Sequence, residues 1–162
     1  MRKRALHAGA GGSLLVSTIL IHGALGGSLQ SDPAESHLSN IKQLTAGGTN
    51  AEAYFSADGH WLIFQSTRRG RACDQQYVMR VDGTSLQRVS PGTGKTTCGY
   101  FFDHDRRIFF SSTHGADTAC PTRPDPSKGY VWGLDPFDIY TADRDGSHLQ
   151  RLTNFGAHIF EE

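Results

Sequence analysis

The chain has 162 residues, a length that suits one domain. Sixteen Lys and Arg balance sixteen Asp and Glu, so the chain lacks the basic surplus expected of a nucleic-acid-binding protein. Glycine accounts for 19 residues, about 12% against a usual ~7%. Together with nine Phe and five Tyr, this glycine content favours short aromatic strands joined by tight turns and disfavours an all-helical fold.

Residues 1–26 have the layout of a secretory signal peptide. Arg2, Lys3 and Arg4 precede an apolar stretch, and small residues at positions 24 and 26 suit a signal peptidase. We expect a periplasmic or secreted protein; an uncleaved anchor or a wrongly assigned start is the alternative. The stretch is too short and too polar for a transmembrane helix, so no stable membrane span is expected after removal of the signal. Residues 27–40 are polar and without period, which predicts a linker.

Two segments of the chain repeat. Residues 53–67 align without a gap on residues 99–113, an offset of 46, with five of fifteen positions identical. Residues 76–90 align on residues 139–153, an offset of 63, with six of fifteen identical. The offsets differ by 17, so the second unit carries an insertion of that size between its halves.

Each unit predicts four strands. In the first unit they are residues 54–56, 61–65, 76–81 and 86–90, and in the second 100–102, 107–111, 138–143 and 149–153. Asp-Gly pairs at 58–59, 82–83 and 145–146 supply turns, where glycine accepts a positive φ without strain. Four antiparallel strands in about 45 residues are typical of a propeller blade, so the predicted fold class is all-β, with four-stranded antiparallel blades.

The first unit reads Phe-Ser-x-Asp-Gly at 55–59, Ser-Thr-Arg at 66–68 and Tyr-Val-Met-x-x-Asp-Gly at 77–83. These motifs resemble the WD-like repeats of TolB-type β-propellers, which also occur in the propellers of prolyl oligopeptidase-type peptidases. The resemblance covers residues 41–153 and implies the fold, but it leaves the function open. In the second unit Asp103-His104-Asp105 departs from the usual turn sequence.

The propeller is predicted to be incomplete. Residues 41–45 are a third copy of the fourth strand, and residues 154–162 begin a further blade after the blades at 51–90 and 97–153. We expect either a fragment of a longer TolB-like protein or a short chain of which several copies form one ring. Open blade edges favour self-association in either case.

Three cysteines, Cys73, Cys98 and Cys120, are expected on one face, where the loops between second and third strands and the connections between blades emerge. An exported chain meets an oxidising compartment, so a disulfide is predicted, with Cys98 best placed for either partner. The third thiol would be left over, available to the missing portion. Metal binding is the weaker alternative, because there is no Cys-x-x-Cys spacing.

The insertion falls within residues 113–137, on the same face. It contains four prolines, which restrict the shapes of a loop, followed by Lys128, Tyr130 and Trp132. Because interfaces favour Tyr and Trp, these three residues are candidates for an interaction loop. The alternative is that Tyr130 and Trp132 only cover the neighbouring blade.

No cofactor, metal or catalytic residue is predicted. Gly94-Lys95-Thr96 ends like a phosphate-binding loop, but Val89 stands where that loop needs its first glycine, and a strand pattern follows instead of a helix. The histidines share no metal-ligand spacing, and there is no Gly-x-Ser-x-Gly elbow.

The sequence therefore favours a non-enzymatic exported scaffold that binds a protein or peptide partner. The alternative is the propeller portion of an exported prolyl oligopeptidase-like hydrolase without its catalytic domain. A polysaccharide-cleaving propeller is a third hypothesis, disfavoured because the inner strands at 53–56 and 99–102 are mostly apolar or aromatic.

Overall fold

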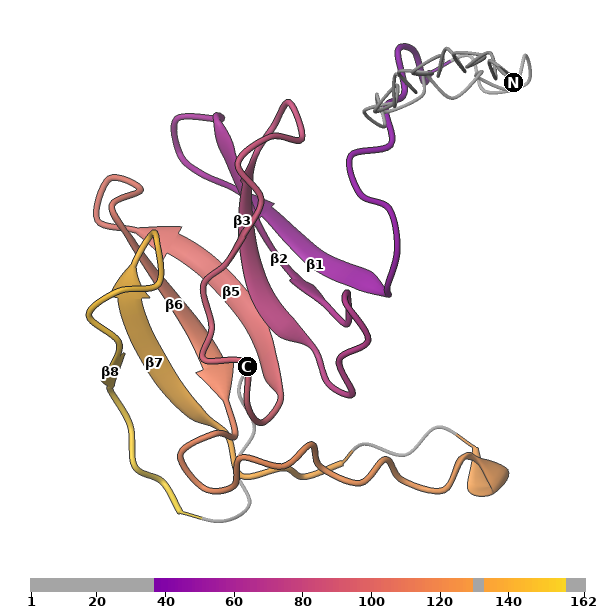
Figure 1. The fold of residues 1–162 in the computed structure, drawn as a ribbon, viewed down its shortest axis with the longest axis vertical. Coiled ribbons are helices and arrows are strands. Elements are labelled where there is room, and N and C mark those ends of the chain that lie inside the picture. Colours follow the sequence, from indigo (N-terminus) through magenta and orange to yellow (C-terminus); the bar gives the residue numbers. More distant parts are fainter. Residues whose placement is uncertain (1–36, 130–132, 157–162) are drawn as a thin grey trace, which may run out of the picture.

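The computed structural model describes residues 37–129 and 133–156, which form two four-stranded antiparallel sheets (Figure 1). Blade 1 consists of β1 (Asn50–Phe55), β2 (Trp61–Ser66), β3 (Gln75–Arg80) and β4 (Gln87–Arg88). Blade 2 consists of β5 (Thr96–Phe102), β6 (Arg107–Ser112), β7 (Asp138–Asp143) and β8 (Gln150–Arg151). Strands that follow one another in sequence are neighbours in each sheet, which confirms the predicted all-β class and the four strands of each unit.

Several predicted features lie outside the described residues: the signal peptide, most of the linker, Tyr130, Trp132 and residues 157–162. In the described part of the chain, no helix has the length and apolar character needed to span a membrane.

The inner strands of the two blades carry a β-bulge at equivalent positions. The register shifts between Ala51 and Tyr54 in β1, and between Thr97 and Tyr100 in β5. The bulged residues Glu52 and Cys98 have φ values of 50° and 49°, in the left-handed region that L residues rarely adopt. These bulges continue the pairing beyond the predicted inner strands, so β1 and β5 begin four residues earlier than expected.

The main core lies between the blades. Its buried members are Ile63, Val78 and Val89 from blade 1 and Ile108, Phe110, Tyr140 and Ala142 from blade 2. Strand β5 lies across β1, β2 and β3, so that it forms the inner edge of blade 2 against blade 1 (Figure 1). Gly99 in β5 permits this approach, because a Cβ there would lie 2.5 Å from Oε1 of the buried Gln76. Each large apolar side chain buried here contributes roughly 1.5–3 kcal/mol.

Trp61 packs between the blades. It is partly buried against the main core. The guanidinium of Arg144, from blade 2, lies 4.5 Å from the centroid of its ring, a cation–π contact across the interface.

The turn between β5 and β6 is where the second unit departs from the Asp-Gly pattern. Asp103, His104 and Asp105 have successive φ values of 51°, 56° and 62°. The buried carboxylate of Asp105 accepts the backbone N–H groups of Ala57 and Asp58, at 2.8 and 2.9 Å. Asp105 thus joins the first hairpin turn of blade 2 to that of blade 1. Its hydrogen bonds offset the energetic cost of the left-handed backbone.

Thr49, just before β1, pairs with blade 1 in the same way as Lys95, at the end of the connection between the blades, pairs with blade 2. Thr67 donates its N–H to the carbonyl of Thr49 at 3.1 Å, and Thr113 donates to the carbonyl of Lys95 at 3.0 Å. In return, the N–H groups of Thr49 and Lys95 each donate to the threonine hydroxyl at 3.0 Å. The repeat therefore extends upstream of β1, although residues 41–45 belong to neither sheet.

Candidate functional site

Three loops meet at one end of the two sheets: residues 67–74 between β2 and β3, residues 89–95 between the blades, and the described part of residues 113–137 between β6 and β7. We refer to them as the loop face. Hydrogen bonds join the three loops to one another: Gly94 donates its N–H to the carbonyl of Thr118 at 2.8 Å, and Arg71 donates to the carbonyl of Gly92 at 2.9 Å. The loop face is thus one surface assembled from both blades.

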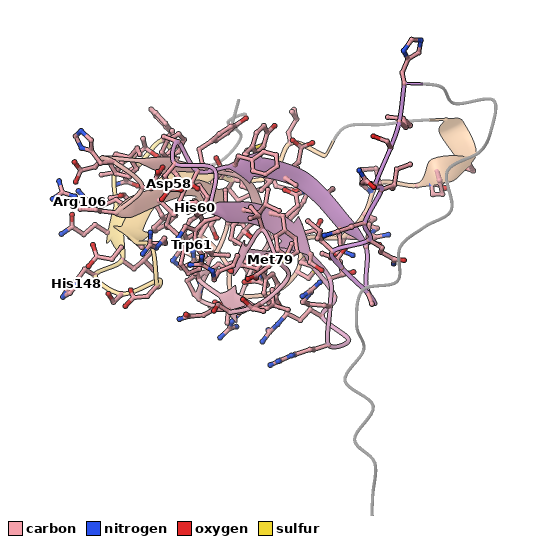
Figure 2. All side chains as sticks on the ribbon, turned by 90° about the horizontal axis from the view of Figure 1, so that it is seen from above. Asp58, His60, Trp61, Met79, Arg106 and His148 are labelled. Atoms are coloured by element: carbon pink, nitrogen blue, oxygen red, sulfur yellow. A yellow bond between two sulfur atoms is a disulfide. The ribbon has the colours of Figure 1, made fainter. Side chains whose placement is uncertain are left out.

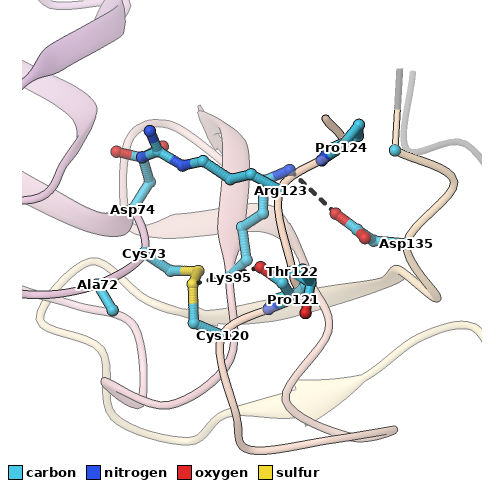
Figure 3. A pocket seen from close by; sticks show the side chains of 11 residues that line it. Ala72, Cys73, Asp74, Lys95, Cys120, Pro121, Thr122, Arg123, Pro124 and Asp135 are labelled. Atoms are coloured by element: carbon cyan, nitrogen blue, oxygen red, sulfur yellow. Dashed lines mark hydrogen bonds and ion pairs between the residues drawn. A yellow bond between two sulfur atoms is a disulfide. The ribbon is translucent and has the colours of Figure 1, made fainter. Parts of the chain in front are cut away.

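A disulfide between Cys73 and Cys120 braces this face (Figure 3). It ties the β2–β3 loop of blade 1 to the root of the insertion in blade 2, with 5.6 Å between the Cα atoms and 47 residues between the two positions. A disulfide was predicted, but the preference for Cys98 as one of its members is corrected by this pairing.

The reason is the position of Cys98 in β5, at the bulge rather than in a loop. Its N–H donates to Oε1 of Gln65 at 3.2 Å, and its sulfur lies 3.2 Å from the hydroxyl of Thr97. These contacts keep Cys98 with the paired strands, whereas the loops that carry Cys73 and Cys120 face each other. The early start of β5, which depends on the bulge, is the feature that the sequence pattern did not show.

The disulfide forms one wall of a cavity of about 250 Å³ (Figure 3). Four charged side chains line it: Asp74, Lys95, Arg123 and Asp135. Lys95 Nζ forms an ion pair with Asp135 Oδ2 at 3.0 Å and lies 5.4 Å from the ring centroid of Phe137. Burial raises the pKa of Asp74, and the nearby charges of Lys95 and Arg123 oppose that rise. A second hollow, of about 160 Å³, shares Ala72, Cys73 and Cys120 with the first.

Sequence reasoning did not identify these four charged residues as a set. They come from all three loops and follow no recognisable spacing in the sequence. Lys95 stands out in the sequence only as part of a segment that resembles a phosphate-binding loop. In the structure β5 begins at Thr96, so a strand follows this loop, as the sequence indicated.

The candidate interaction residues are only partly described. Lys128 is the last residue of η1 (Pro126–Lys128), a 3₁₀ turn capped by the side chain of Asp125, which accepts the N–H of Ser127 at 2.9 Å. This turn lies at the far end of the insertion, away from both sheets (Figure 1). Tyr130 and Trp132 follow it and lie outside the described residues.

The opposite end of the sheets carries the hairpin turns and has mixed charge. A shallow hollow of about 460 Å³ is lined by three Asp and three Arg side chains: Asp103, Asp143, Asp145, Arg106, Arg107 and Arg144. His148 Nδ1 lies 2.7 Å from Asp143 Oδ2, and Figure 2 shows His148 and Arg106 on the same side of the molecule. Arg106 pairs with Asp103 at 2.8 Å. Positive and negative side chains lie beside one another here, so this end of the molecule has no electrostatic potential of a single sign.

Within residues 37–129 and 133–156, no group of three or more His, Cys, Asp or Glu side chains comes together in a way that could hold a metal ion. The described chemistry is therefore that of ion pairs, hydrogen bonds and one disulfide.

No protein-family model matches the chain, and no curated protein matches it. Among solved structures it is similar to a protein described as a putative TolB from Agrobacterium tumefaciens, with a TM-score of 0.54 and 23% sequence identity. The similarity covers 74% of this chain and 39% of that one. It shows that the two blades have the TolB-like propeller fold, and that the chain spans well under half the length of its structural neighbour.

Proposed function

We propose that the protein is a non-enzymatic, exported propeller scaffold that binds a protein or peptide partner through the loop face. The observation that carries this proposal is the disulfide between Cys73 and Cys120, which fixes the insertion of blade 2 against blade 1. A recognition loop that is held in place before binding loses less conformational entropy on binding, and this favours affinity.

The composition of the described insertion supports the same role. It contains four prolines, which restrict its backbone, and it exposes Leu134, whose side chain is 53% accessible. Tyr130 and Trp132, the aromatic candidates for direct contact, belong to the same loop.

Export is proposed from two features. Residues 1–26 have the pattern of a signal peptide, and disulfides form and persist in oxidising compartments such as the periplasm. The mature chain would begin close to residue 27.

Site-specific photocrosslinking in cells tests the proposal. A photoreactive phenylalanine at exposed Leu134 is expected to form one discrete adduct, whereas the same residue at exposed His60, in a hairpin turn at the other end of the sheets, should not. The pair of substitutions C73S and C120S should reduce the adduct at Leu134 by freeing the root of the loop. Equal adducts at Leu134 and His60, or no adduct at Leu134, would contradict the proposal.

A further inference from the structure

The cavity beside the disulfide contains two pairs of opposite charges in different states. The first pair is satisfied: Lys95 Nζ lies 3.0 Å from Asp135 Oδ2, and the Asp135 side chain is only 15% exposed. These two charges neutralise each other in a sheltered position. The second pair, Asp74 and Arg123, remains for a ligand.

Hydrogen bonds hold the backbone of Asp74 in place, but not its carboxylate. Its carbonyl accepts the N–H of Thr96 at 3.0 Å and the hydroxyl of Thr96 at 3.2 Å. Its carboxylate makes no hydrogen bond or ion pair with the residues that the structure describes. A half-buried carboxylate without a partner has an unfavourable solvation free energy, and burial accordingly raises the pKa of this group.

Arg123 extends from the insertion toward Asp74 at the mouth of the cavity (Figure 3). The charge of Lys95, and after it that of Arg123, lowers the pKa of Asp74, yet no ion pair within 4.0 Å joins Asp74 to either of these described side chains. The guanidinium is planar and presents donors suited to a carboxylate. The carboxylate of Asp74 and the exposed guanidinium of Arg123 therefore lie close together without a hydrogen bond or ion pair to any side chain that the structure describes.

We propose that this cavity binds a free α-amino acid, with the ligand ammonium on Asp74 and the ligand carboxylate on Arg123. The four lining charges sum to zero, which matches a neutral zwitterion better than a simple anion or cation. The volume of about 250 Å³ would take about eight waters at roughly 30 Å³ each, a space of amino-acid size. The ligand would be a small molecule, distinct from the partner proposed for the loop face.

The experiment uses the mature, oxidised protein and the common α-amino acids as probes. Each amino acid is titrated by ligand-observed NMR, and the strongest binder is compared with its N-acetyl derivative, which lacks the ammonium, and its α-amide, which lacks the carboxylate. Both derivatives are expected to bind roughly tenfold or more weakly than the parent.

The variants Asp74→Asn and Arg123→Gln then assign each contact. D74N should weaken binding of the parent amino acid and of the amide but leave binding of the N-acetyl derivative unchanged. R123Q should weaken binding of the parent and of the N-acetyl derivative but not of the amide. Asp117→Asn and Arg69→Gln, which do not line the cavity, serve as matched controls and should bind as the wild type does.

Three outcomes would overturn the inference: no binding by any amino acid, binding that survives N-acetylation and amidation, or equal binding by D74N, R123Q and the controls. A thermal melt of each variant confirms that it is folded. Because crosslinking at Leu134 is measured separately, failure of the amino-acid site and failure of the partner site give different results.

Discussion

Asp105 is the side chain that most directly couples the two blades at the hairpin end. Its carboxylate accepts two N–H groups from the first turn of blade 1, and its own carbonyl accepts Nη1 of Arg144 at 3.3 Å. The residue is 6% exposed, so water cannot easily replace the lost hydrogen bonds.

Asp105→Ala is expected to lower the free energy of unfolding by roughly 2–3 kcal/mol, because the N–H groups of Ala57 and Asp58 lose their charged acceptor. Asp105→Asn should cost less, since asparagine tolerates the left-handed backbone and retains one acceptor oxygen. Urea denaturation followed by circular dichroism measures both. Asp117→Asn, at an exposed position, is the control; equal effects at the two positions would contradict the role assigned to Asp105.

His114 gives the fold a pH dependence. Its ring lies 4.1 Å from that of Tyr140, centroid to centroid, and its Nδ1 lies 2.7 Å from the hydroxyl of Ser112. Burial lowers the pKa of His114, the guanidinium of Arg151 lowers it further, and Asp138 opposes the shift. The neutral imidazole is therefore the form that the fold favours.

Because the pKa of His114 is lower in the folded than in the unfolded state, the unfolded chain binds more protons just below the unfolded value of 6.5. Stability should be fully present above this pH and should fall as the pH drops through the folded pKa. His114→Gln should flatten the change in unfolding free energy between about pH 7 and about pH 5. An unchanged pH profile in H114Q, or a flattening in the exposed-site control His60→Gln instead, would refute this assignment.

Among the elements, the insertion owes its position to the disulfide. The bond closes a loop of 47 residues between Cys73 and Cys120, which restricts the unfolded chain and favours the folded one. It also joins elements of different blades, so its loss acts on the interface as well as on the loop.

The double variant C73S/C120S is expected to lose roughly 3–5 kcal/mol of unfolding free energy, the amount associated with closure of a loop of this length. Equilibrium denaturation of the oxidised wild type, the reduced wild type and the double variant measures it. The reduced wild type should behave like the double variant, and Cys98→Ser should retain most of the stability of the oxidised protein. A C98S variant as unstable as C73S/C120S would contradict the observed pairing.

The strands could be predicted from sequence because alternation and turn chemistry repeat. β7 matches its predicted range, β2 and β6 are one residue longer at the C-terminal end, and β3 is shifted by one residue. The bulges at Glu52 and Cys98 could not be predicted, since neither residue type signals a positive φ. The wrong prediction that Cys98 forms part of the disulfide has the same cause. The bulge places this cysteine within a strand, whereas it was expected at the end of a connection.

The meeting of the loops on one face could be predicted from the sequence, but the charged cavity on that face could not. Chain topology places the β2–β3 and β6–β7 loops at one end, so the location of Cys73 and Cys120 together follows from the repeat. The approach of Asp74, Arg123 and Asp135 depends instead on the path of a long proline-rich loop, and no periodic pattern specifies that path.

At the scale of the whole molecule, the described blades leave apolar surface uncovered. Phe55 in β1 is 67% exposed, and Phe109 is only half-buried, with Tyr100 and Phe102 against its ring. Phe109 is equivalent to Ile63, which is fully buried between the blades, and no described element packs on Phe109 in the same way. This surface favours association with further propeller strands.

The chain without residues 1–26 is therefore expected to self-associate as its concentration rises. Sedimentation velocity over a range of concentrations tests this expectation, and Phe55→Lys should reduce association by charging an exposed strand. A monodisperse monomer at every concentration would contradict it.

A disulfide map of the protein, isolated from the cells that produce it, is the most direct test of the assembled loop face. Thiols are alkylated before digestion without reductant, and the joined peptides are identified by mass spectrometry. One peptide pair linking Cys73 to Cys120 is expected, since this bond holds the insertion of blade 2 on blade 1 and assembles the loop face. A bridge from Cys98 to either cysteine, or full alkylation of all three, would contradict both the assembled face and the function proposed for it.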